Sequence, residues 1–198
     1  MINQEQIFGV VAAGAAITAM TADSANADVA DFAGPYVGLG FGTMAGEVGD
    51  DYNYAIGTGL AFSGFGGYNW VNGNTLMGVE LGLWSNDVYF GGGDGDYGIE
   101  GLIDLRGRLG MGIGENTMLY GAAGLWRGDY LFEFDEDGGT ASGFSVGIGF
   151  ETNLSNNMFI GGDLTMRSTN WVSLNDPTDD DKSPDSVTTA SVRVGFRF

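Results

Sequence analysis

The last eight residues of the sequence, Ser191-Val192-Arg193-Val194-Gly195-Phe196-Arg197-Phe198, limit the fold to two classes. Apolar side chains alternate there with serine, glycine and two arginines. Because successive side chains of a β-strand point to opposite faces, one face of this strand is hydrocarbon and the other carries charge. Two folds accommodate such a strand: a soluble sheet whose apolar face is the core, and a transmembrane barrel whose apolar face meets lipid. The rest of the sequence has to distinguish them.

Residues 1–27 have the pattern of a secretory signal peptide. An apolar run begins at Ile7 and ends near Met20, and Ala25-Asn26-Ala27 supplies a small-x-small cleavage site. Residues 1–6 carry no Lys or Arg, which departs from the usual signal. A membrane-anchoring helix is the alternative, but the run is shorter than the roughly 20 residues that such a helix needs. The sequence therefore predicts an exported protein with a signal peptide at 1–27 and a barrel domain at 28–198.

After this leader, eight segments alternate with period two, which is the pattern of strands. They are residues 36–42, 57–71, 75–85, 98–113, 117–130, 143–154, 158–170 and 187–198. Tight turns rich in Asn and Gly alternate with four longer acidic stretches, at 43–56, 84–97, 129–142 and 170–186. Short turns at one end and long loops at the other are typical of outer-membrane barrels. The fold class predicted is an all-β, eight-stranded antiparallel up-and-down transmembrane barrel, whose lumen side chains fill.

The placement of charge indicates which face is inside. Six of the seven basic residues are arginines, and all six fall within predicted strands on the face that is not apolar. Acidic residues share that face, so opposite charges would pair in a narrow lumen, where unpaired charges are costly. A soluble sheet with a mixed-charge face is the alternative. The predicted lumen ion-pair network consists of Glu80, Glu100, Asp104, Arg106, Arg108, Arg127, Glu151, Asp163, Arg167, Arg193 and Arg197.

Aromatic residues are expected to form two girdles at the membrane interfaces. Near the tight-turn ends lie Tyr36, Tyr68, Trp70, Tyr120 and Phe198. Near the loop ends lie Trp84, Trp126, Tyr130 and Trp171.

Four short stretches carry a resemblance to a known family: Gly34-Pro35-Tyr36-Val37-Gly38, Gly67-Tyr68-Asn69-Trp70, Leu105-Arg106-Gly107-Arg108-Leu109-Gly110 and Met118-Leu119-Tyr120-Gly121. They resemble stretches of the small outer-membrane β-barrel family, the OmpA-like or opacity-type porin-like proteins of alphaproteobacteria. The resemblance covers nearly all of the chain after the leader. It implies that the barrel-assembly machinery reads the last strand as an assembly signal. The positions that match this signal are Val192, Val194, Phe196 and Phe198.

The composition narrows the function. The chain has no His and no Cys, so the commonest general base and two common metal ligands are missing, and we expect no enzyme, no cofactor and no dedicated metal site. The sequence leaves open whether the acidic loops bind divalent cations through carboxylate oxygens. A net charge of -19 disfavours nucleic-acid binding. The expected partners are outer-membrane lipid and lipopolysaccharide, and the assembly machinery during biogenesis. The sequence names no host or surface receptor, and we expect a monomer located in the cell outer membrane.

The resemblance implies a role in envelope integrity, adhesion or modest solute permeability, and the fold alone does not select among these. The function predicted is structural or interactive, with acidic extracellular loops on display. One alternative is a narrow cation-preferring porin-like channel. Another is a secreted soluble β-sandwich binder.

Overall fold

A computed structural model describes residues 29–49, 58–86, 88–91, 96–113, 115–132, 135–154, 157–174 and 183–198. This part of the chain contains one short 3-10 helix, η1 (Val29–Phe32), and β-strands otherwise. The strands are β1 (Gly34–Gly49), β2 (Thr58–Asn72), β3 (Thr75–Asn86), β4 (Val88–Gly91), β5 (Asp96–Ile113), β6 (Thr117–Phe132), β7 (Asp135–Asn153), β8 (Met158–Leu174) and β9 (Ser183–Arg197). In this described part, no helix is long and apolar enough to cross a membrane.

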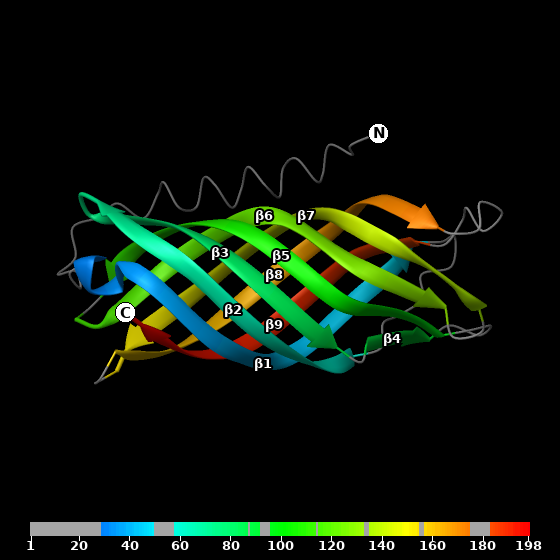
Figure 1. Ribbon diagram of the computed structural model, residues 1–198, viewed down its shortest axis with the longest axis horizontal. Helices are drawn as coiled ribbons and strands as arrows, with labels where there is room; N and C mark the ends of the chain where they lie inside the picture. Colours follow the sequence, from blue (N-terminus) through cyan, green and yellow to red (C-terminus); the bar gives the residue numbers. More distant parts are fainter. Residues whose placement is uncertain are drawn as a thin grey trace.

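The long strands close into a barrel (Figure 1). Each pairs antiparallel with its neighbours in the order β3-β2-β1-β9-β8-β7-β6-β5, and the pairing of β3 with β5 closes the ring. The short strand β4 pairs with the first residues of β5. The prediction of an eight-stranded antiparallel up-and-down barrel is confirmed, and the soluble β-sandwich is wrong, because the sheet closes on itself instead of stacking on a second layer.

The strand register fixes the stagger of the barrel. Following paired residues once around the ring leads from Tyr36 back to β1 at Gly46, ten residues further along the strand. For eight strands, this stagger corresponds to a tilt of about 40° and a backbone diameter of about 16 Å. A cylinder of this width leaves an interior that side chains fill.

The strands extend further than the alternation predicts, at the end where the long loops were expected. β7 begins at Asp135, so most of the predicted loop at 129–142 is strand. A bulge interrupts the pairing of β5 with β6, where Gly101 has a φ of 60°. Glycine adopts this left-handed conformation without the strain that a side chain brings.

Both described chain ends lie at the same end of the barrel as the turn between β2 and β3 (Figure 1). The Phe198 amide donates a hydrogen bond to the Pro35 carbonyl at 3.0 Å. The helix η1 precedes β1 at this mouth of the barrel and packs against β2 and β3. Residues 1–27, predicted as a signal peptide, lie outside the described residues.

Candidate functional site

Inward-facing glycines make room for the large side chains that fill the lumen. A methyl group on Gly149 would overlap the Tyr120 ring, and one on Gly67 would overlap Tyr36. The glycine that alternates with apolar residues along the strands therefore has a packing role. It leaves space at the same height for an arginine or an aromatic side chain from another strand.

Glu80 on β3 is the centre of the lumen charges, and only 1% of it is exposed. Its carboxylate accepts hydrogen bonds from Arg106 Nη2 at 2.5 Å, Arg193 Nη2 at 2.5 Å and Arg108 Nη1 at 3.2 Å. The Tyr36 hydroxyl donates to the same carboxylate at 3.0 Å. The Glu80 carboxylate thus links its own strand, β3, to arginines of β5 and β9.

Asp163 on β8 accepts from a second set of donors. Arg106 Nη1 lies 3.2 Å from its carboxylate, the Tyr120 hydroxyl 2.7 Å and the Thr165 hydroxyl 2.5 Å. Arg193 Nη1 lies 3.4 Å away. Because Arg106 and Arg193 each contact both Glu80 and Asp163, the two carboxylates belong to one network across the barrel.

Glu151 on β7 extends this network towards the turn end. Arg108 Nη2 donates to it at 2.6 Å and Arg197 Nη2 at 2.9 Å. The guanidinium of Arg108 also lies 3.8 Å from the centre of the Tyr120 ring, and that of Arg193 lies 3.8 Å from the centre of the Phe65 ring. We call the charged residues on the turn side of the lumen the lower cluster. They are Glu80, Arg106, Arg108, Glu151, Asp163, Arg193 and Arg197.

Asp104 and Arg167 form a separate pair nearer the loop end. Arg167 donates from Nε to Asp104 Oδ1 at 3.2 Å and from Nη2 to Asp104 Oδ2 at 2.5 Å, which is the two-pronged geometry of a strong pair. The Trp84 indole donates to the same carboxylate at 3.1 Å, and Arg167 Nη1 donates to Thr189 at 2.6 Å. A cavity of about 10 Å³, room for about one water molecule, lies beside the lower cluster and is lined by Glu80, Arg193 and Trp84 among others.

Apolar side chains bound the charges at both ends. At the turn end, Phe32 of η1 is fully buried against Leu76 and Met118. The Asn69 side chain holds the Phe32 carbonyl at 3.1 Å. At the loop end, Leu102 occupies the inward position directly beyond Asp104 on β5, and it is buried. Further buried apolar residues on the loop side are Met44, Ala61, Trp126 and Val187.

Nine of the eleven residues predicted for the lumen network lie in it. Within the described residues, five arginines and four carboxylates are buried there, so the positive charges exceed the negative ones by one. They are Arg106, Arg108, Arg167, Arg193, Arg197, Glu80, Asp104, Glu151 and Asp163.

Of the two remaining predicted residues, one faces away from the lumen and the other has no described side chain. Arg127 on β6 is exposed, and the described residues give it one hydrogen bond, to Thr140 Oγ1 at 3.5 Å. It has the same parity as Leu125, which is also exposed, so it faces outward and its assignment to the lumen has to be corrected. The side chain of Glu100 lies outside the described part of the structure. Its backbone pairs with Asp129, on the far side of the bulge at Gly101.

The predicted aromatic girdles are partly wrong. Tyr68, Trp70, Trp171 and Phe198 are exposed on the outer surface, as expected. In contrast, the lumen holds Tyr36, Tyr120, Trp84 and Trp126. The alternation along the strand already indicates that Tyr36 and Trp84 point inward. Each lies an even number of residues from the inward glycines or charges of its own strand, and an odd number from the apolar residues that face lipid. The side chain of Tyr130 lies outside the described residues.

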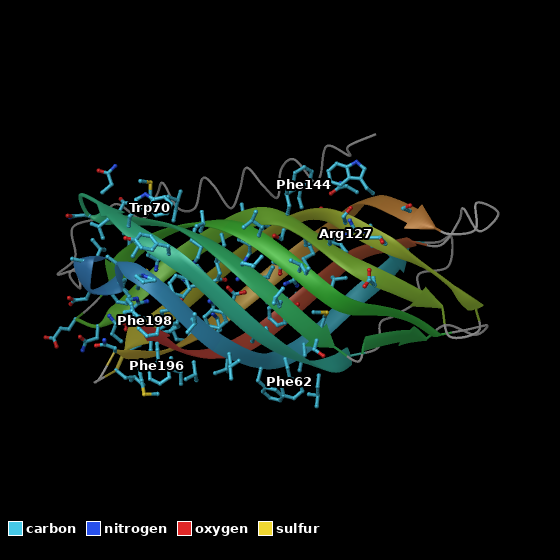
Figure 2. The ribbon with its side chains drawn as sticks, in the orientation of Figure 1. Phe62, Trp70, Arg127, Phe144, Phe196 and Phe198 are labelled. Atoms are coloured by element: carbon cyan, nitrogen blue, oxygen red, sulfur yellow. The ribbon has the colours of Figure 1, made fainter. Side chains whose placement is uncertain are left out.

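The outer surface of the barrel is an apolar belt. Figure 2 shows Phe62, Phe144 and Phe196 projecting away from the strands. Leu39 is 72% exposed and Phe198 is 74% exposed, values that a soluble core would not allow. The four residues of the predicted assembly signal, Val192, Val194, Phe196 and Phe198, all lie on this outer face. Their role in assembly stays a prediction.

A closed antiparallel barrel with a lipid-facing apolar belt and a polar, filled interior defines a transmembrane β-barrel. The sequence matches the family described as outer membrane protein beta-barrel domain over residues 10–198. The chain belongs to this family and is located in the cell outer membrane. The predicted resemblance to small outer-membrane barrels is confirmed.

Known proteins give the same assignment. The chain is similar to the 22 kDa outer membrane protein of Rhizobium leguminosarum bv. viciae, with 39% identity over 131 residues, which are 63% of this chain and 58% of the relative. The match thus spans less than two thirds of that relative. Among solved structures, the attachment invasion locus protein Ail of Yersinia pestis aligns with a TM-score of 0.51 and 18% identity, over 84% of this chain and 99% of Ail. Neisserial surface protein A aligns with a TM-score of 0.53 and 11% identity, over 83% of this chain and 97% of that one. At these identities, the two structures show a shared fold.

Proposed function

We propose that the protein is a closed, monomeric barrel that stabilises the outer membrane and displays acidic loops outside the cell, without conducting solutes. The observation that carries this proposal is the filled lumen. Within the described residues, four barriers follow one another along the lumen. From the turn end, an ion has to pass the buried ring of Phe32, which we call the plug, then the lower cluster, the Asp104–Arg167 pair and the apolar layer around Leu102. Each barrier is tied to the barrel wall by packing or by hydrogen bonds.

The charge balance of the described lumen argues against the cation-preferring channel. Five buried arginines face four buried carboxylates. The excess positive charge raises the energy of a cation in the lumen, where the dielectric constant is low. The acidic stretches at the loop end, which would attract cations, are described only in part.

The way in which the buried acids are bonded supports a role without catalysis. Among the described residues, each of the four buried lumen carboxylates is bonded to at least one guanidinium. A carboxylate held in this way is a poor general acid or base, and the sequence has no histidine to take its place. We therefore propose a structural and interactive role, with lipopolysaccharide as the surrounding partner.

Planar-bilayer recording tests the closed state. The folded protein is added to a bilayer at 100 mV, and we expect no discrete openings. A variant that carries Phe32→Ala, Arg108→Ala and Arg193→Ala together removes the plug and two guanidiniums, and its openings would show that insertion and detection work. Reproducible openings of the unaltered protein, selective for either sign of ion, would overturn the proposal in favour of a pore.

A further inference from the structure

Arg127 differs from the other arginines that the structure describes, because its side chain is exposed on the outer wall. Figure 2 labels it towards the loop side of the barrel, near Phe144. It pairs across the sheet with Ser142, and Ser142 pairs with Trp171. Arg127 is not part of the ion-pair network in the lumen. Its position on the lipid-facing surface requires a separate explanation.

The neighbours of Arg127 place it at the edge of the apolar belt. Leu125, two residues earlier on the same strand and towards the membrane centre, is exposed to lipid. Phe144 on the adjacent strand β7 and Trp171 on the next strand, β8, have ring centres 5.5 Å apart. An exposed tryptophan at the end of an apolar belt is typical of the membrane–water interface, where its ring lies among headgroups.

We propose that Arg127 binds a phosphate group of a phosphorylated glycolipid in the outer leaflet. The guanidinium is planar and presents paired N–H donors that fit phosphate oxygens. Thr140 lies beside it at 3.5 Å, and Ser142 is its cross-strand neighbour, so two hydroxyl donors can add to the same phosphate. With a net charge of -19, the protein repels anions at long range. A direct contact at the height of the headgroups is therefore needed to hold the lipid.

The alternative is that Arg127 only neutralises Asp129, which is exposed on the same strand two residues further towards the loops. The Asp129→Asn background separates the two explanations. If Arg127 only neutralises Asp129, Arg127→Gln has no further effect on lipid binding in that background. If Arg127 binds phosphate, Arg127→Gln still weakens lipid binding there.

Native mass spectrometry of the folded barrel in detergent micelles that contain diphosphoryl lipid A tests the proposal. The measurement is the fraction of barrel that carries one lipid A across a concentration series. We expect Arg127→Gln to weaken binding about tenfold, equivalent to about 1.4 kcal/mol, and Asp129→Asn to bind at least as tightly as the unaltered protein. Heat-modifiable gel migration shows that each variant is folded.

Two further lipids identify the group that is recognised. With lipid A lacking both phosphates, the unaltered protein and the Arg127→Gln variant should bind equally. Phosphatidylglycerol, a phosphodiester, should bind more weakly than diphosphoryl lipid A. Equal binding of diphosphoryl lipid A by the unaltered protein and Arg127→Gln would overturn the proposal, as would weaker binding by Asp129→Asn. Equal binding of phosphatidylglycerol and lipid A would overturn the assignment to a glycolipid.

Discussion

Substitution of Glu80 by Gln removes the central negative charge of the lower cluster and keeps the size of the side chain. The carboxylate accepts from three arginines and one tyrosine, with distances from 2.5 to 3.2 Å. Removing one partner of a buried ion pair costs about 3–5 kcal/mol, because the remaining charge stays buried without compensation. Since three guanidiniums lose the same carboxylate, we expect the free energy of unfolding to fall by at least about 3 kcal/mol.

The assay is urea unfolding of the barrel in phospholipid vesicles, followed by tryptophan fluorescence and by heat-modifiable gel migration. The matched control is Glu115→Gln, the same chemical change at an exposed position in the turn between β5 and β6. We expect this control to change the free energy of unfolding by less than about 0.5 kcal/mol. A loss below about 1 kcal/mol for Glu80→Gln would refute the reasoning, because it would mean that the lumen charges are solvated.

A double substitution separates charge balance from lost hydrogen bonds. Arg193→Gln alone leaves Glu80 with two arginines. Combined with Glu80→Gln, it restores the original charge balance of the lumen. We expect the double variant to be more stable than the sum of the two single losses predicts, by about 1–3 kcal/mol. Strict additivity would show that the two residues act independently.

Three further changes test the packing and the surface. Gly149→Ala places a methyl group in the Tyr120 ring and should lower the free energy of unfolding in urea by about 1–3 kcal/mol. Gly64→Ala, where the methyl group meets open space, should be close to neutral. Equal effects would contradict the conclusion that inward glycines make room for large side chains. Phe32→Ala should lower the free energy of unfolding by up to about 3 kcal/mol and still give no openings in planar bilayers, because the lower cluster remains, so openings of this variant would make η1 the main barrier. Phe198→Ala removes an exposed ring, so unfolding in vesicles should change by less than about 1 kcal/mol while the amount assembled in the outer membrane of cells falls several-fold; unchanged assembly would remove the predicted signal.

The sequence predicts the barrel because two periodic signals agree over most of its length. Period-two alternation indicates the strands, and the alternation of tight turns with long stretches indicates which end of the barrel carries the long loops. The ends of the strands are predicted less accurately. β7 begins in residues such as Asp135 and Gly139 that have low strand propensity, and pairing with β6 holds them in the sheet.

The lumen charges could be predicted from parity wherever the opposite face is clearly apolar. On β5, Asp104 and Arg106 alternate with Ile103 and Leu105, so their direction is certain from the sequence. On β6, residues 121–124 are Gly-Ala-Ala-Gly, and small residues on both faces leave no parity signal. The outward position of Arg127 therefore could not be read with the same certainty. Phe32 precedes the first strand, and no periodic pattern indicates that it plugs the lumen.

The buried charges also explain how such a glycine-rich barrel keeps one register. A slip of one residue turns every side chain of a strand to the other face. In β9, a slip would place Arg193 and Arg197 in lipid and leave Glu80 and Glu151 without them. A charged side chain on the lipid face costs about 2–4 kcal/mol near the bilayer midplane, and the abandoned carboxylates add their own penalty. An apolar lumen would impose no such cost, because either face of the strand would then suit lipid. The ion pairs therefore specify which face is inside, in addition to closing the lumen.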